Sequence, residues 1–360
     1  MSQINRKIGV ILFNLGGPDK LESVRPFLFN LFNDKAIISL PQPLRWMLAK
    51  IISNKREKKA QGIYAQMNGK SPILDITLSQ ADSLERELSF HGDFKVFTIM
   101  RYWHPFAKDV VKKINEYRPD EIILLPLYPQ FSSTTSASSI KDFGDNFTDS
   151  QTPIKIICCY PLQDDFIKSH VANINQTLNK IPSELQSQIR LLFSAHGLPQ
   201  KIIDNGDPYV FQVESTVKST MEKLENLRKV NCQSANNSLD YAICYQSKVG
   251  PLKWTTPSLE HEIRRASLDR KIPVIIPIAF VSDHSETLVE LDIEYKELSA
   301  HLGIEHYYRV PALNIERNFI TAMTKMVLSV AKNNDSALFC GEGKQRICPK
   351  KLKLCPNPHY

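Results

Sequence analysis

Three glutamates recur at a four-residue spacing toward the C-terminal end of the chain, at Glu286, Glu290 and Glu294. In a helix, side chains four residues apart lie on one face. Stacked like charges cost roughly 0.2 to 0.5 kcal/mol per pair, which a solvated helix face tolerates without any function. The functional alternative is a carboxylate ladder that conducts protons or hard divalent cations. Asp283 and His284, directly before it, would add oxygen and imidazole ligands.

A histidine follows a predicted strand and precedes a Gly-Leu-Pro turn, at His196. The near-continuous apolar run 189–195 is typical of a strand buried on both faces of a parallel sheet. Ligands of open parallel sheets bind at the C-terminal strand ends. His196 is therefore placed to act as a base or a metal ligand, because imidazole titrates near neutral pH. A turn histidine with a structural hydrogen bond is the simpler alternative.

Cations and aromatic residues cluster after two further strands, at residues 100–105 and 246–254. The first cluster contains Arg101 and Tyr102, and the second contains Lys248 and Trp254. Such surfaces suit a flat, anionic, apolar ligand. Core aromatics with snorkelling basic side chains are an equally good interpretation.

Alternating strands and helices would position these residues. Apolar runs predict strands at 8–14, 94–100, 121–128, 154–160, 189–195, 241–246, 273–282 and 306–311. Amphipathic helices lie between them, one of them from about 285 to 302, and this alternation predicts an α/β fold with parallel sheets covered by helices. Two runs of four strands predict two similar domains, each with a four-stranded sheet, at residues 1–165 and 166–330. Residues 331–360 form a basic, Cys-containing tail.

Composition excludes several classes of protein. Hydrophobic residues make up 42% and charged residues 23%, and no apolar run approaches the roughly 20 residues that span a bilayer. The net charge of +7 is spread out, so nucleic-acid binding is not indicated. Seven cysteines in a long chain argue against a disulfide scaffold and for a reducing compartment.

One segment carries apolar residues followed by a basic flank, at 41–59. Its apolar part, residues 41–52, is called the lip below. It predicts a surface that touches anionic lipid or admits an apolar substrate. A helix covering the domain core is the alternative.

Taken together, these residues resemble ferrochelatase, the family that inserts ferrous iron into protoporphyrin IX in the last step of haem synthesis. The resemblance runs from Ile8 to about Val330. The matching stretches are residues 14–18, 71–73, 101–105, 128–130, 194–199, 245–254 and 280–292. The last three together are highly specific.

The resemblance implies a lyase with two Rossmann-like domains and an active-site cleft between them. It implies that His196 and Glu286 are the catalytic and metal-contacting pair. It implies an acidic path for protons or metal through Asp283, His284, Glu290 and Glu294. Its porphyrin-binding residues correspond to Leu15, Tyr64, Ser71, Arg101, Tyr102 and Trp254. Leu15 replaces a Met common in animal members, a nearly volume-conserving change.

The implied chemistry agrees with these residue types. Bending the porphyrin exposes its nitrogen lone pairs, and binding energy would supply that strain. A base must then remove two pyrrole protons, and His196 has a suitable intrinsic pKa. Glu286 and the ladder can remove protons or deliver iron, and the division of tasks between His196 and Glu286 stays open. Arg101 could pair with a propionate.

Iron itself is a substrate, so catalysis requires no cofactor. Some members hold a [2Fe–2S] cluster on four cysteines. Here the tail offers Cys340, Cys348 and Cys355, and Ser133 stands where animal members have the fourth cysteine. Cys158 could replace it only if it lay nearby. A flexible tail with free thiols is the alternative.

Other functions remain open at this stage. The chain could act on coproporphyrin or insert metal into another tetrapyrrole, although its long lip region favours protoporphyrin. A non-catalytic porphyrin or haem delivery protein would not need both His196 and the glutamate ladder. The composition, with no recognisable targeting segment, predicts a cytoplasmic bacterial protein, monomeric or homodimeric, that touches the inner membrane peripherally through the lip.

Overall fold

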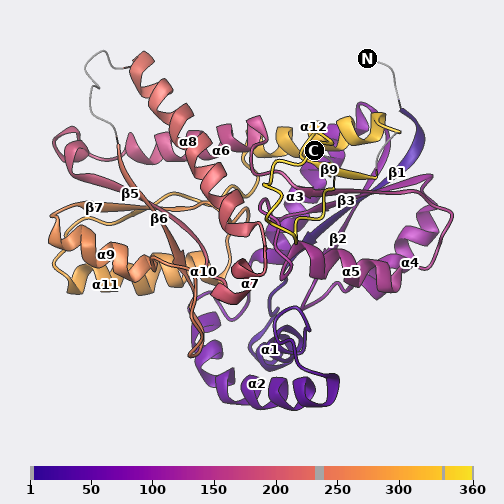
Figure 1. The fold of residues 1–360 in the computed structure, drawn as a ribbon, viewed down its shortest axis with the longest axis horizontal. Helices are drawn as coiled ribbons and strands as arrows, with labels where there is room; N and C mark the ends of the chain where they lie inside the picture. Colours follow the sequence, from indigo (N-terminus) through magenta and orange to yellow (C-terminus); the bar gives the residue numbers. More distant parts are fainter. Residues whose placement is uncertain (1–3, 232–238, 335–336, 359–360) are drawn as a thin grey trace. The chain divides into compact units, whose positions relative to one another are not determined.

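The computed structural model describes residues 4–231, 239–334 and 337–358, and the chain divides into two compact units (Figure 1). The first unit runs to Tyr160 and also takes in residues 323–347 and 356–360. The second comprises residues 161–322 and 348–355. The tail therefore contributes to both units, whereas the sequence predicts it as a separate segment after 330.

The first unit is built on a parallel sheet with the strand order β2-β1-β3-β4-β9. Its strands are β1 (Ile4–Asn14), β2 (Gly92–Met100), β3 (Glu121–Pro126), β4 (Ile154–Cys159) and β9 (Leu338–Cys340). In β1, residues 8–14 are all buried, apolar and β-branched residues among them, which is what a central strand covered on both faces requires. Four strands were predicted. The fifth, β9, comes from the tail and is too short to show a pattern of its own.

Helices cover both faces of this sheet (Figure 1). On one face lie α3 (Ile73–Ser89) and the later part of α12 (Arg317–Lys332), and on the other lie α4 (Ala107–Tyr117) and α5 (Ser136–Asn146). The α4 side packs through a buried cluster that includes Phe13, Ile99 and Phe143. This α/β core holds the C-terminal strand ends in fixed positions.

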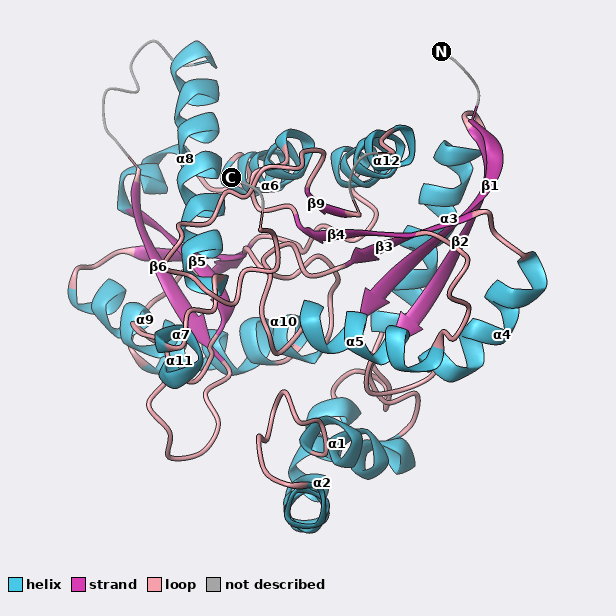
Figure 2. Ribbon diagram, turned by 45° about the vertical axis from the view of Figure 1, so that its right-hand side comes forward, coloured by secondary structure: helices cyan, strands magenta, loops and turns pink. Residues whose placement is uncertain are grey.

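A helical pair extends from the first unit beyond the arrowheads of β1 and β2 (Figure 2). A single turn, η1 (Leu21–Ser23), leads into α1 (Val24–Phe32), and α2 (Gln42–Ala65) packs on α1. The pair shares a core formed by Val24, Phe27, Leu28, Tyr64 and Tyr102. The lip forms the first turns of α2, which begins after Pro41 with a proline in its first turn.

The second unit has a four-stranded parallel sheet with the order β6-β5-β7-β8. Its strands are β5 (Ile189–His196), β6 (Asp240–Gln246), β7 (Ile272–Pro277) and β8 (Tyr308–Arg309). One face carries α6 (Asp164–Leu178) and α8 (Tyr209–Asn231), and the other carries α9 (Leu259–Leu268) and α11 (Tyr295–His301) (Figure 1). The connecting elements are η2 (Ser183–Gln188), α7 (Gln200–Asp204) and α10 (Ser285–Leu288). The predicted class of two helix-covered parallel sheets is confirmed.

The helix predicted over 285–302 is interrupted. Between α10 and α11 lies a π-helical turn, η3 (Glu290–Glu294). Here the Val289 carbonyl accepts from the amides of both Ile293 and Glu294, each at 3.0 Å. Such turns are uncommon and are frequent at functional sites. In the part of the chain that the structure describes, no helix is both long enough and apolar enough to cross a membrane.

Candidate active site

His196 and Glu286 meet at the C-terminal edge of the second sheet. His196 is the last residue of β5, and its Nε2 lies 3.6 Å from Oε1 of Glu286 in α10. Its Nδ1 lies 2.6 Å from the carbonyl of Gly197, which fixes the ring plane. The opposite carboxylate oxygen of Glu286 lies 3.7 Å from Nε2 of His284. The carboxylate therefore sits between two imidazoles.

The two imidazoles determine the charge of Glu286. Burial alone would raise the pKa of this carboxyl, but His196 and His284 more than offset burial and lower it to about 2. Burial likewise opposes charge on His284. The hydrogen bond and charge of Glu286 prevail, so the pKa of His284 is raised. Glu286 is thus a carboxylate at neutral pH, facing a half-exposed His196.

Glu290 lies in a different environment one turn further on. Ser247 donates to its carboxylate through its amide, at 2.8 Å, and through its hydroxyl, and Gln246 donates through Nε2 at 3.1 Å. Gln246 also donates to the backbone carbonyl of Glu286, at 2.8 Å. Burial and the neighbouring charge of Glu286 nevertheless raise the pKa of Glu290. Glu290 is therefore well suited to take up a proton.

Glu294 and Asp283, the other two carboxylates of the predicted acidic path, have surroundings different from those of Glu290. Glu294 ends the π-helical turn and is exposed. Asp283 is buried and held by Arg309 Nη1 at 2.9 Å and by Asn314 Nδ2 at 2.8 Å. The structure thus engages Asp283 with partners outside the glutamate ladder. Sequence reasoning gave no role to Arg309, since nothing local marks one arginine in an edge strand.

Among the described residues, no three His, Cys, Asp or Glu side chains form a group that would hold a metal ion as they lie. His196, His284 and Glu286 nevertheless supply imidazole nitrogen and carboxylate oxygen near one another, and these are ligand types that suit divalent metal ions. Trp254 lies beside this cluster, with its ring centroid 6.4 Å from that of His196.

In the first unit, the predicted porphyrin-binding residues converge near the end of β1. Tyr64 and Tyr102 are buried in the core of the helical pair, and Leu15 packs against that core. Ser71 approaches Gly17 so closely that a Cβ there would lie 2.5 Å from the Ser71 Cβ. Glycine is therefore required at residue 17 for this contact with Ser71. The sequence alone indicates only a tight turn there.

Arg101 is already paired. Its Nη2 lies 2.9 Å from Oδ2 of Asp34, and its Nε donates to the Ser138 hydroxyl at 2.8 Å. Tyr102 donates its hydroxyl to the same Asp34 oxygen at 2.8 Å. Asp34 and Ser138 were not predicted, because a single acidic residue in a loop and one serine of a Ser-rich helix carry no sequence signal.

The tail cysteines are divided between the units. Cys340 in β9 pairs with Cys159 in β4, with the sulfurs 3.3 Å apart, and Cys158 Sγ lies 3.5 Å from Cys159 Sγ. Hydrogen bonds to both neighbouring thiols, together with burial, raise the pKa of Cys159. Cys348 and Cys355 belong to the second unit, where Gln212 Nε2 lies 3.1 Å from Cys348 Sγ.

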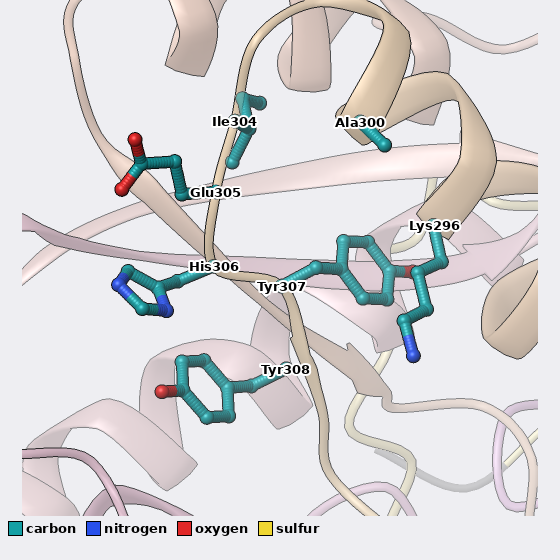
Figure 3. A pocket seen from close by; sticks show the side chains of 7 residues that line it. All are labelled: Lys296, Ala300, Ile304, Glu305, His306, Tyr307 and Tyr308. Carbon is teal, nitrogen blue, oxygen red and sulfur yellow. The ribbon is translucent and has the colours of Figure 1, made fainter.

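A shallow pocket also opens on the second unit (Figure 3). Its lining residues are Lys296, Ala300, Ile304, Glu305, His306, Tyr307 and Tyr308. None of the predicted site residues lines it. Figure 3 shows the ring of Tyr307 extending from the β8 segment toward Lys296.

Comparisons with known proteins identify similar chains. The sequence pattern of the family described as ferrochelatase matches residues 7–331. A Rickettsia bellii protein named ferrochelatase is 49% identical over 356 residues, which cover 98% of this chain and 96% of the relative. A Pelagibacter ubique protein of the same name is 46% identical over 98% of this chain and 99% of its own. Among solved structures, SirB from Bacillus subtilis with Fe³⁺ covers 91% of this chain and 96% of its own at 12% identity and a TM-score of 0.49.

Proposed function

Because the chain belongs to the ferrochelatase family, we propose that it inserts ferrous iron into protoporphyrin IX. The reaction joins Fe²⁺ to the four pyrrole nitrogens and releases the two pyrrole N–H protons. One observation supports the assignment most strongly. An imidazole and an ionised carboxylate face each other at 3.6 Å at a parallel-strand end, where α/β proteins bind ligands.

His196 is the proposed proton acceptor. Its Nε2 faces the carboxylate of Glu286, which stabilises the imidazolium formed when a pyrrole proton is taken up. Its side chain is about one third exposed, so a substrate can reach it. The same carboxylate, with its lowered pKa, is the proposed oxygen ligand for the incoming cation.

The glutamate ladder is the proposed path along which the metal ion arrives and the two protons leave. Glu290 follows Glu286 and has a raised pKa, so it can take up a proton that the Glu286–His196 pair releases. Glu294 is exposed and can pass that proton to solvent. His284 holds the second oxygen of Glu286 and keeps the carboxylate turned toward His196. Asp283, engaged by Arg309 and Asn314, supports this segment.

The porphyrin is proposed to contact Leu15, Tyr64, Ser71, Arg101 and Tyr102 of the first unit and Trp254 of the second. Tyr64 and Tyr102 are buried in the core of the helical pair, so they would contact the ring as part of the wall of its site. Arg101 keeps its guanidinium about one fifth exposed although it pairs with Asp34. Its charge is therefore available to a propionate carboxylate.

The substrate assignment is tested by comparing porphyrins under anaerobic conditions with Fe²⁺. Protoporphyrin IX and coproporphyrin are supplied in parallel, and haem formation is followed by absorbance. We expect a higher kcat/KM for protoporphyrin IX. A preference for coproporphyrin would assign the chain to the other substrate class, and bound porphyrin without turnover would indicate a delivery protein.

The lip is the proposed contact with a membrane surface, which would place this protein at the cytoplasmic face of a bacterial inner membrane. Leu44, Trp46, Met47 and Ile51 of α2 are each 44 to 52% exposed, an unusual density of exposed apolar side chains. The basic residues Lys55, Lys58 and Lys59 follow on the same helix. Apolar insertion beside positive charge favours an anionic lipid surface.

Vesicle flotation tests this contact. The protein should float with vesicles containing phosphatidylglycerol, and a Leu44→Ser/Met47→Ser variant should lose that binding. Leu268 is 84% exposed on α9, so Leu268→Ser is a matched control that should still float. Flotation that is unchanged in the lip variant would contradict the proposed contact.

A [2Fe–2S] cluster is proposed as an accessory group of the tail. Four cysteines are required, and Cys340, Cys348 and Cys355 with Cys158 or Cys159 offer them. The support is that Cys340 Sγ lies 3.3 Å from Cys159 Sγ, next to Cys158, which brings a candidate fourth thiolate to the tail strand. No catalytic step uses the cluster.

The proposed cluster is tested by measuring the iron and acid-labile sulfide contents of anaerobically purified protein. About two of each per chain are expected, with visible absorption that Cys348→Ser abolishes. Cys244→Ser, a buried cysteine of β6, is the control and should keep the absorption. Colourless protein free of sulfide would contradict the cluster and leave the tail with free thiols.

A further inference from the structure

Glu286 and Glu290 lie in a segment that is held at both ends by one arginine. Arg309 of the edge strand β8 binds Asp292 with both Nε and Nη2, at 2.7 Å each. Its Nη1 binds Asp283 at 2.9 Å. Asp283 precedes Glu286 and Asp292 follows Glu290, so the guanidinium spans the segment that carries both carboxylates.

Tyr307, directly before β8, contacts the backbone of the same segment. The Tyr307 hydroxyl donates to the carbonyl of Leu291 at 2.7 Å, inside the π-helical turn. π-helical turns are rare, and this one is contacted from outside by the side chains of Tyr307 and Arg309. We call Tyr307 and Arg309 together the β8 clamp.

The clamp opposes a repulsion. Glu286 is ionised, and its charge acts on Glu290, which lies within one turn of it. Ser247 and Gln246 attract Glu290 from the β6 side, while Arg309 and Tyr307 fix the turn from the β8 side. Arg309 is itself anchored, because β8 pairs with β7 through Ile275↔Arg309 and the arginine side chain is 12% exposed.

We propose that the β8 clamp is a positioning device, which holds the Glu290 carboxylate next to that of Glu286 so that both serve the incoming metal ion. The inference rests on the proposed roles of these two glutamates. The guanidinium of Arg309 contacts Asp283 and Asp292, so in this proposal it acts through the segment that it holds. Loss of the clamp should therefore weaken the use of the metal ion more than the binding of the porphyrin.

The test substitutes Arg309 and compares it with a matched arginine. Arg190, at the opposite end of β5, also bridges two aspartates, Asp240 and Asp269, at 2.8 Å each, and its side chain is equally buried. Arg309→Met and Arg190→Met thus each remove a cation that bridges two carboxylates of the second unit. Arg309→Lys and Tyr307→Phe are milder changes that keep the protein folded if Arg309→Met does not.

Zinc insertion into protoporphyrin IX is the assay. Arg309→Met should lower kcat/KM for zinc about tenfold or more, with the porphyrin Kd changed less than twofold. Arg309→Lys should recover part of the loss, and Arg190→Met should stay within twofold of the wild type. In a Glu290→Gln background, Arg309→Met should cost less than a further twofold, because its target is already absent.

Equal losses in Arg309→Met and Arg190→Met, or an undiminished loss in the Glu290→Gln background, would overturn the inference. Wild-type protein that does not insert zinc would contradict the proposed function instead. In that case the role of the clamp is tested by measuring the affinity of the protein for zinc alone by calorimetry. Arg309→Met should then weaken zinc binding about tenfold while Arg190→Met does not, and equal zinc affinities would overturn the inference.

Discussion

Glu286 and Glu290 are chemically identical carboxyl groups one helical turn apart, and their surroundings push their pKa values in opposite directions. Two imidazoles lower the pKa of Glu286 to about 2, while burial and the Glu286 charge raise that of Glu290. Paired groups with separated pKa values are typical of sites that move protons. The four-residue spacing was visible in the sequence, but the difference between the two groups depends on burial and on imidazoles, one of which, His196, comes from β5.

The role of Glu286 is tested by truncation. Glu286→Ala should lower kcat for metal insertion by about 10² to 10⁴, the range expected when an acid–base or charge-stabilising group is lost. Porphyrin binding, measured by fluorescence quenching, should remain nearly intact. Glu297→Ala removes an exposed glutamate of α11 that lies outside the ladder and serves as the control, with a much smaller effect expected. An unchanged kcat in Glu286→Ala would refute the assigned role.

Glu290 should destabilise the fold at neutral pH. Because its pKa is raised above the ordinary 4.5, the folded protein holds this proton more tightly than the unfolded chain does. The free energy of unfolding therefore falls as the pH rises through 4.5 toward the raised value, and it stays lower above that value. Glu290→Gln should accordingly raise the melting temperature at about pH 7, by roughly 2 to 4 °C per kcal/mol, and leave it unchanged at about pH 3. The same shift at both pH values would show that charge is not the cause.

At the scale of elements, the helical pair α1–α2 depends on one buried carboxylate. Asp34 accepts from Arg101, Tyr102 and Ser138 and caps the turn that follows α1 through the amide of Ala36. The lip begins seven residues later in the same connection. The Asp34 side chain therefore connects the residues that follow β2 to the loop that leads from α1 to the lip.

Asp34→Ala should lower the free energy of unfolding by about 1 to 3 kcal/mol, because it leaves the buried Tyr102 and Ser138 hydroxyls without their acceptor, while Arg101 keeps Asp142 at 3.6 Å. Urea denaturation measures this loss. Asp75→Ala breaks the exposed pair with Lys70 and should cost less than about 1 kcal/mol. Similar losses in the two variants would mean that the Asp34 cluster contributes nothing beyond a surface ion pair.

Long, uniformly apolar strands were predictable, and local irregularities were not. The apolar runs of β1, β3, β5 and β7 show burial on both faces directly in the sequence. The π-helical turn was predicted as ordinary helix, because Leu291 and Tyr295 keep an α-helical spacing, whereas the contacts of the wider turn with Tyr307 and Arg309 come from distant residues. β9 has three residues and acquires its strand conformation only by pairing with β4.

At the scale of the whole molecule, the tail is part of both units rather than an appendage. Residues 337–347 add β9 to the first sheet, and residues 348–355 pack in the second unit. There the amide of Leu354 donates to the carbonyl of Gly206 at 3.1 Å, and Gly206 has a φ of +95°. A Cβ at Gly206 would lie 2.8 Å from the Lys353 amide nitrogen. The polar, basic composition of the tail gave no indication of this docking.

Gly206→Ala should therefore lower the free energy of unfolding by about 1 to 3 kcal/mol and make the tail more sensitive to limited proteolysis. Gly62→Ala is the control, because Gly62 lies in α2 with no atom within 4 Å of an added Cβ. That change should be neutral or stabilising by up to about 1 kcal/mol. A tail that is equally protected in Gly206→Ala and in the wild type would show that its docking does not depend on this contact.

The central claim is that His196 and Glu286 insert a metal ion into protoporphyrin IX, and zinc insertion by the purified protein tests it most directly. Zinc needs no protection from oxidation, and the fluorescence of the zinc porphyrin reports turnover. The wild type should turn over, and His196→Ala should lose at least about 10²-fold in rate while it still binds porphyrin. Turnover by His196→Ala at the wild-type rate, or a wild type that binds porphyrin and never inserts zinc, would contradict the account.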